Sequence, residues 1–214
     1  MTGDEHHHLF VTRAEAGEAV EIFNGAGHVW QGVVEQLGKR EAVVRIESEF
    51  DVPPPPVELI LGFAIIRAAP LEWAIEKAVE VGVTRIVPFT TRQSNAPAPR
   101  RDRWQRIVVE SAKQSKRYHL PRVESVLAFE DALTIPAKSR LMFSEHGGKP
   151  LKSVALESPV LYLIGPEGGW TPEEISRAAA AGFVPVYLGP HILRAETAAI
   201  VGAALLLHEI DRIH

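Results

Sequence analysis

Residues 161–175 read LYLIGPEGGWTPEEI and place three kinds of local structure next to one another. The leucine-rich run that ends at Ile164 predicts a buried β-strand. Thr171 as the cap, Pro172 at the first helical position and Glu174 at the third predict the start of a helix. The segment between them, residues 165–169, is therefore a glycine-rich loop at the carboxyl end of a strand, where open α/β sheets bind ligands.

The chemistry of this loop is indicated by its one charged residue, Glu167. The loop lacks the Gly-Lys-Ser/Thr ending of a phosphate-binding loop and the Gly-x-Gly-x-x-Gly spacing of a dinucleotide-binding fold. A carboxylate among bare amides suits a ligand that carries a positive group or hydroxyl and amino donors. The alternative is a tight turn whose glycines serve only positive φ angles.

A second loop, LGPHILRAETA at residues 188–198, follows another predicted strand. It places Arg194, Glu196 and Thr197 at the mouth of an apolar helix, where charges are costly unless they are used or paired. The alternative is an ion pair together with a favourable glutamate at a helix start. The helix itself, from about Ala195 to Ile210, is apolar on nearly every side, which predicts deep burial or contact with another subunit.

Strand and helix patterns alternate through residues 57–214 and predict an α/β domain with a largely parallel sheet. Upstream, residues 1–52 contain alternating and β-branched runs with turn signals between them, which predict a small antiparallel β domain, expected to be a barrel. The stiff segment Asp51–Pro56, with four consecutive prolines, separates the two patterns. We therefore expect a domain boundary there.

Composition excludes several classes of protein. The 214 residues are 46% hydrophobic and 23% charged, as in ordinary globular proteins, and no apolar run approaches a membrane span. No secretion signal is recognisable, so a cytoplasmic location is expected. The absence of cysteine excludes disulfides, thiolate zinc sites and cysteine nucleophiles.

The net charge of −4 is distributed unevenly. Residues 100–122 contain eight Lys or Arg and two acidic residues, a net charge of +6, so the rest of the chain carries −10. Such segregation favours an anionic partner. The alternative is a solvated helix face, because Trp104, Ile107, Val108, Ser111 and Ala112 recur at helical spacing and would face a core.

Taken together, LIGPEGGWTPEEI and LGPHILRAETAAIVGAALL resemble the paired signature of the RsmE family, the SPOUT-superfamily methyltransferases that act on N3 of a uridine in 16S ribosomal RNA. LEWAIEKAVEVGVTRIVPFTTRQS, ESAKQSKRYHLPRV and HHLFVTRAEAGEAVEIFNGAG are similar to further segments of that family. One stretch departs from it, because residues 67–70, Arg-Ala-Ala-Pro, stand where the family has a Lys-Gly-Asp-Arg-like sequence.

The resemblance implies a trefoil-knotted parallel-sheet domain at residues 57–214 that binds S-adenosylmethionine, behind a PUA-like β-barrel at residues 1–52. The sequence begins late compared with the family, so we expect the first strand of the barrel to be truncated or absent. It also implies a homodimer through the last helix and 16S ribosomal RNA or the small ribosomal subunit as partner. The implied cofactor contacts are Leu163, Ile164, Gly165, Glu167, Gly168, Gly169, Leu188, Gly189, Ile192, Leu193 and Thr197. The implied RNA contacts are Arg13, Arg106, Lys113, Gln114, Arg117 and Arg122.

For catalysis the resemblance implies methyl transfer to a ring nitrogen that must lose a proton. We assign Arg194 to the stabilisation of the resulting anion, and Glu196 or a water to the proton. No metal is expected, and methylation at pyrimidine carbon 5 is excluded because it needs a thiol. The alternatives are a SPOUT enzyme with a ribose or transfer-RNA target and a non-catalytic RNA-binding module.

Overall fold

The computed structural model describes residues 15–38, 41–94, 100–145 and 147–211. The chain forms two compact units, Met1–Pro54 and Pro55–His214. The proline run of residues 53–56 spans the division between them. Because proline cannot donate a main-chain hydrogen bond and fixes φ, such a run continues neither a helix nor a central strand.

The first unit contains an antiparallel sheet of strands β1 (Ala19–Phe23), β2 (His28–Leu37) and β3 (Ala42–Asp51) in the order β1-β2-β3. The β1–β2 turn is closed by Asn24, whose Oδ1 accepts the main-chain N–H groups of Ala26 and His28 at 2.8 and 3.1 Å. The prediction of an antiparallel β domain in this part of the chain is confirmed. The strand expected to be truncated and Arg13 lie outside the described residues.

The second unit is built on an eight-stranded sheet in which every pairing is parallel. Its main path is β6-β5-β4-β10-β8-β11-β9, and β7 also pairs with β5. The strands are β4 (Leu59–Ala64), β5 (Arg85–Thr90), β6 (Arg122–Val123), β7 (Leu127–Ala128), β8 (Ser139–Phe143), β9 (Lys149–Pro150), β10 (Val160–Ile164) and β11 (Val184–Tyr187). The parallel α/β prediction is thus confirmed, although it omitted the two-residue strands.

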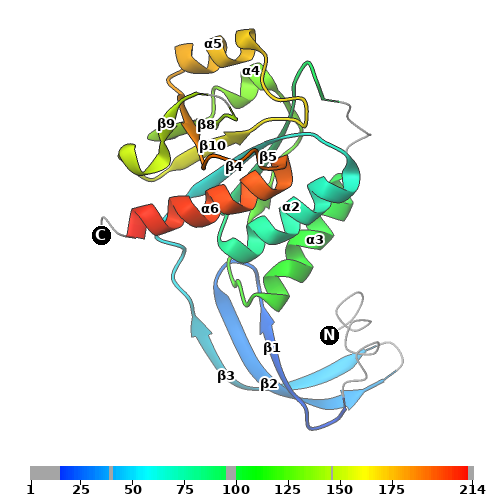
Figure 1. The fold of residues 1–214 in the computed structure, drawn as a ribbon. Coiled ribbons are helices and arrows are strands. Elements are labelled where there is room, and N and C mark those ends of the chain that lie inside the picture. Colours follow the sequence, from blue (N-terminus) through cyan, green and yellow to red (C-terminus); the bar gives the residue numbers. More distant parts are fainter. Residues whose placement is uncertain (1–14, 39–40, 95–99, 146, 212–214) are drawn as a thin grey trace. The chain divides into compact units, whose positions relative to one another are not determined.

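The helices cover both faces of this sheet (Figure 1). They are α2 (Ala68–Val81), α3 (Arg101–Gln114), α4 (Phe129–Ala132), α5 (Pro172–Ala180) and α6 (Ala195–Asp211), with a 3-10 turn η1 at Leu151–Ser153. Figure 1 shows α2, α3 and α6 on one face and α4 and α5 on the other. With both faces covered, β4 and β10 are buried along their whole length, which explains their continuous apolar sequences.

Helix α5 begins as its sequence predicts. Thr171 Oγ1 accepts the main-chain N–H of Glu174 at 3.2 Å, and Glu174 Oε2 accepts that of Thr171 at 2.9 Å. This reciprocal capping box fixes where the glycine loop after β10 ends.

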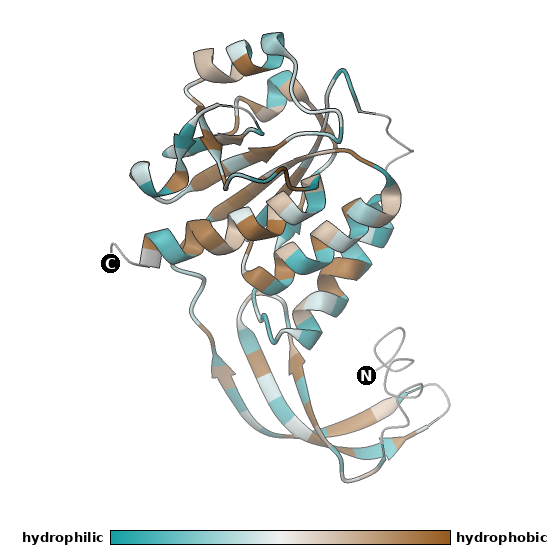
Figure 2. Ribbon diagram, viewed as in Figure 1, coloured by the Kyte–Doolittle hydropathy of each residue, from teal (hydrophilic) through white to brown (hydrophobic). Residues whose placement is uncertain are grey.

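Helix α6 is the most apolar helix of the unit (Figure 2). One side packs inward through Ala199, Ala203, Leu206 and Ile210, while Ala204 is exposed and Leu205 is half-buried. The buried Tyr162 hydroxyl donates to the Ala199 carbonyl at 3.0 Å, which ties α6 to β10, and burial raises the pKa of Tyr162. Within the described parts of the chain, no helix is long and apolar enough to cross a membrane.

Candidate active site

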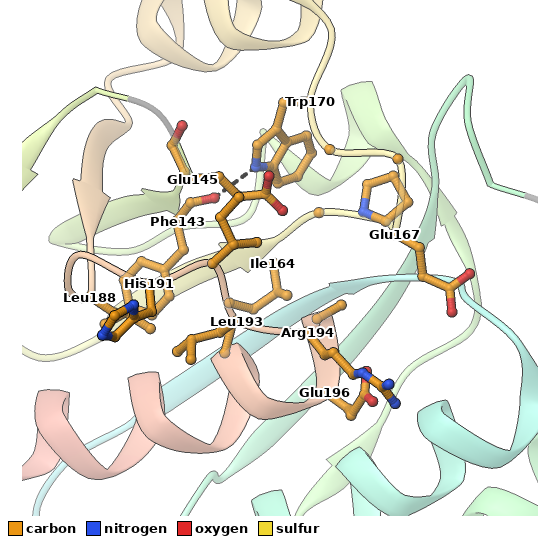
Figure 3. A pocket seen from close by; sticks show the side chains of 18 of the residues that line it. Phe143, Glu145, Ile164, Glu167, Trp170, Leu188, His191, Leu193, Arg194 and Glu196 are labelled. Carbon is orange, nitrogen blue, oxygen red and sulfur yellow. Dashed lines mark hydrogen bonds between the residues drawn. The ribbon is translucent and has the colours of Figure 1, made fainter.

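A pocket of about 710 Å³ lies at the carboxyl end of the parallel sheet (Figure 3). Its walls come from the segments that follow β4, β10, β8 and β11, which are four consecutive strands of the sheet. Because parallel strands all end at the same edge, residues far apart in sequence meet there. The volume falls within the usual range for small-molecule sites.

The glycine loop after β10 forms one wall. A Cβ atom on Gly165 would lie 2.8 Å from Cε2 of Trp170, so the indole requires glycine at this position. Gly169 has a φ of +73°, a conformation that favours glycine, whereas Gly168 has no positive φ and is crowded only by the Gln93 side chain. Gly165 is therefore required by the close contact with the Trp170 ring, and Gly169 is favoured by its backbone conformation.

The loop between β11 and α6 forms the facing wall through Leu188, Gly189, Ile192 and Leu193. Ile192 is 66% exposed, unusually high for a large apolar side chain. The Arg194 carbonyl accepts the N–H of Ala198 at 2.8 Å and so starts the helical hydrogen bonding of α6. An apolar wall at the mouth of a pocket suits a ligand with an apolar face.

A third wall comes from Phe143, Ser144 and Glu145 at the end of β8, which the sequence analysis did not include. Trp170 Nε1 donates to the Phe143 carbonyl at 2.7 Å, and its ring stacks on Phe89 with centroids 6.1 Å apart. The signal that could have found this segment is the apolar run that ends near residue 143, because parallel strands all end at the same edge of a sheet.

Arg67 and Glu167 join the end of the β4 segment to the glycine loop. Arg67 donates to one oxygen of Glu167, Oε1, from Nε at 3.0 Å and from Nη2 at 2.9 Å. Both side chains are well exposed, so the pair contributes little to stability. It does hold the Glu167 carboxylate against a guanidinium, a contact that the sequence analysis missed because the two residues are 100 positions apart.

The two predicted catalytic residues both line the pocket, at the start of α6. Between Arg194 and the carboxylates of the described residues there is no ion pair, and Glu167 is bound to Arg67 instead. The alternative in which Arg194 serves only as a structural partner of Glu196 or Glu167 therefore finds no support in this geometry. Arg194 is exposed at the rim.

The predicted cofactor residues line this pocket except Leu163 and Thr197. Leu163 is fully buried in the core beside α5, because neighbouring residues of a strand point to opposite faces and its neighbour Ile164 is the one that reaches the pocket. Thr197 lies in the first turn of α6 between two pocket residues, Glu196 and Ala198.

The predicted RNA residues differ in how accessible they are. Arg106, Gln114 and Arg122 are exposed, and Lys113 is paired with Glu110 at 3.0 Å. Arg117 instead donates from Nη1 to the carbonyls of Val79 and Val83 at 2.8 and 3.1 Å, at the end of α2. Burial lowers the pKa of its guanidinium. The geometry gives Arg117 a structural task that the sequence analysis did not foresee.

Two family models match the chain. Residues 53–207 match the model described as an RNA methyltransferase domain, and residues 1–47 match the one described as an RNA methyltransferase PUA domain. Together they cover both compact units.

Individual proteins match over nearly the whole chain. It is 33% identical to the ribosomal RNA small subunit methyltransferase E of Synechocystis sp., over 95% of this chain and 70% of that protein. It is 30% identical to the protein of the same name from Rickettsia conorii, over 95% and 87%. The crystal structure of the Neisseria gonorrhoeae protein of that name, bound to S-adenosylmethionine, superposes with a TM-score of 0.92 at 30% identity and covers 97% of this chain and 90% of that one.

Proposed function

This chain belongs to the RsmE family of RNA methyltransferases, and on that premise we propose that it transfers the methyl group of S-adenosylmethionine to N3 of a uridine in small-subunit ribosomal RNA. The observation that supports this best is that four neighbouring strand ends form one pocket, in which the glycine loop faces the apolar loop before α6. Arg194 and Glu196 stand at the edge of the same pocket.

The residues of the pocket fit S-adenosylmethionine. The glycine loop lets main-chain groups approach a flat base closely, and Ile164, Leu188 and Leu193 supply apolar contact. The carboxylates of Glu145, Glu167 and Glu196 suit a ligand with a positive group and hydroxyl donors. When bound, the cofactor supplies a methyl group on a positively charged sulfur.

The protein's own residues must accept the proton of the uridine and stabilise the negative charge that its loss creates. Uridine N3 carries a proton between two carbonyls, and its loss leaves an anion spread over the ring. We assign Arg194 to that anion because its guanidinium is at the rim and can donate two parallel hydrogen bonds. Glu196 or a water accepts the proton.

The Glu167 carboxylate is a poorer candidate for the base. Its Oε1 already accepts two hydrogen bonds from the Arg67 guanidinium, at 2.9 and 3.0 Å, so this oxygen is occupied by another donor. Methylation at carbon 5 is excluded in this chain because it has no cysteine to attack the ring.

We further propose a homodimer formed through α6, with the half-buried Leu205 in the contact rather than the fully buried Leu206. The trefoil knot and the cytoplasmic location remain predictions. The exposed cations of α3, among them Arg106, are proposed to contact RNA phosphates.

The experiment that tests the function uses the purified protein, S-adenosylmethionine with a labelled methyl group, and separately small-subunit ribosomal RNA, assembled small subunits and transfer RNA. The RNA is then digested to nucleosides and analysed by mass spectrometry. We expect label in 3-methyluridine from ribosomal substrates. Label in a ribose or in transfer RNA would identify another target, and calorimetry that shows no cofactor uptake would indicate a non-catalytic module.

A further inference from the structure

Trp73 is exposed on the outer side of α2. Its side chain is 46% exposed, while Leu71, Ala74, Ile75, Ala78 and Val79 of the same helix face the core. A tryptophan is rarely left this accessible in a folded unit, because its burial is among the largest apolar contributions that a side chain can make. An exposed indole that no core requires is a candidate for binding.

Helix α3 packs against α2 and is joined to it at the residue before Trp73. The preceding residue, Glu72, is paired with Arg103 of α3 through Oε1 and Nε at 2.7 Å. Arg103 remains 59% exposed in this pair, and its neighbours Arg101 and Arg106 are exposed as well. An aromatic face next to several arginines is the usual composition of a surface that binds single-stranded nucleic acid.

The same helix leads to the pocket. Arg67 caps the amino end of α2 and lines the pocket, and its guanidinium is bound to Glu167 of the glycine loop. Trp73 is six positions further along, about 9 Å at the helical rise of 1.5 Å per residue. This distance places Trp73 within reach of nucleotides next to the one that enters the pocket.

Charge limits the binding surface to the first half of α2. Further along the helix, Lys77 Nζ lies 2.7 Å from both Glu76 Oε1 and Glu80 Oε1. That end is acidic overall and would repel phosphates. The exposed cations Arg67, Arg101 and Arg103 instead belong to the amino ends of α2 and α3, and Arg103 is paired with Glu72, the residue before Trp73.

We propose that Trp73 stacks on an unpaired base of the RNA close to the target uridine, and that Arg103 and Arg101 bind the phosphates beside that base. The proposal rests on the proposed function, because it assumes that RNA enters the pocket. It adds a recognition site outside the pocket for a single-stranded segment. Stacking on an indole tolerates any base, so this site selects an unpaired strand rather than a particular sequence.

The test compares Trp73→Ala, Trp73→Leu and Trp73→Phe in methyl transfer to small-subunit ribosomal RNA. We expect the KM for RNA to rise about tenfold in the alanine variant, as for the loss of one stacked base. Leucine should behave like alanine because it has no π face, and phenylalanine should restore most of the affinity. The kcat and the affinity for S-adenosylmethionine should stay at the parental values in all three.

Other results would overturn the proposal in recognisable ways. A folded alanine variant with the parental KM, or a leucine variant as good as phenylalanine, would show that no base stacks on Trp73. Variants that become monomeric would show that a second protein chain covers it. If alanine disrupts folding, the comparison of leucine with phenylalanine still decides, and a wild-type protein without any transfer would contradict the proposed function instead.

Discussion

Trp170 Nε1 donates a 2.7 Å hydrogen bond to the main-chain carbonyl of Phe143, and this bond connects the glycine loop after β10 to the end of β8. The same indole packs on Phe89 and leaves no space for a side chain at Gly165. Trp170 thus positions the glycine loop, although it is the bond to Phe143 that fixes the orientation of its ring.

We predict that Trp170→Phe keeps the ring contacts and loses the hydrogen bond. The free energy of unfolding should fall by about 1 kcal/mol, because the Phe143 carbonyl loses a partner in a partly buried place. The affinity for S-adenosylmethionine should fall several-fold, which calorimetry would measure. Unchanged cofactor affinity in a variant that has lost stability would show that Trp170 supports the fold and not the loop.

A second prediction separates two arginines of the basic segment. Arg117→Ala should lower the free energy of unfolding by about 2 kcal/mol, because its guanidinium donates to the carbonyls of Val79 and Val83. Arg106→Ala, at an exposed position of α3, should leave stability within about 0.5 kcal/mol of the parent.

For RNA binding, Arg106→Ala should have the larger effect of the two substitutions. Arg106→Ala should reduce the slope of log affinity against log salt by roughly 0.7 to 0.9, the effect of one phosphate contact. Binding measured over a salt series checks this, with denaturant unfolding as the parallel measurement. An Arg117 variant that is fully stable and binds RNA poorly would show that Arg117 contacts RNA and does not support the fold.

Neighbouring leucines of α6 provide a matched test of assembly. Leu206 is fully buried, so Leu206→Glu should give an unfolded or insoluble chain. Leu205, one residue earlier, is only half-buried and is proposed to lie in the subunit contact, so Leu205→Glu should give folded monomers by light scattering. A folded, active dimer of the Leu205 variant would place the subunit contact elsewhere.

His28 in the first unit should titrate above its usual range. Its Nδ1 lies 2.7 Å from Asp51 Oδ1, and this hydrogen bond raises the pKa of the imidazole above 6.5, with Glu49 adding to the effect. The proton is therefore held more tightly in the folded state. The stabilisation is complete below about pH 6.5 and is lost as the pH rises through the folded pKa.

Two measurements check this sign. An NMR titration should place the His28 midpoint above 6.5, and Asp51→Asn should lower it. The difference in stability between parent and variant should be larger in mild acid than at alkaline pH. A midpoint that does not respond to Asp51→Asn would show that the pair is not formed in solution.

Much of the fold and part of the site could be predicted from the sequence because they depend on local patterns. The capping box of Thr171 and Glu174 and the glycine loop at a strand end each lie within a short segment. The contacts Arg67–Glu167 and Trp170–Phe143 could not, because they depend on the strand order β4-β10-β8. Periodicity contains no information on which strands are neighbours.

For single residues, the sequence also could not predict which side chains are buried or which groups a charged side chain contacts. Both faces of β10 are buried, so no alternation of polar and apolar residues indicated that Leu163 faces the core and Ile164 the pocket. A count of cations cannot tell that Arg117 is occupied by helix carbonyls while Arg106 is exposed. These distinctions appear only when the elements are packed.

Arg194 is the residue that we assign to the stabilisation of an anionic uridine in this pocket during methyl transfer. Its side chain is exposed at the pocket rim, so Arg194→Ala should leave the fold and most cofactor affinity intact. An interaction made mainly in the transition state affects the rate of transfer rather than binding. Arg194→Lys should recover only part of the rate, because an ammonium cannot make the planar two-donor contact.

The most direct measurement is single-turnover methylation of the RNA by Arg194→Ala at saturating cofactor and RNA, with a melting curve of the same protein. The rate should fall on the order of a hundred- to a thousandfold, as for the loss of one preorganised charge contact, while the melting temperature stays at the parental value. A variant that melts early but transfers the methyl group at the parental rate would contradict the account, because Arg194 would then support the structure and not the reaction.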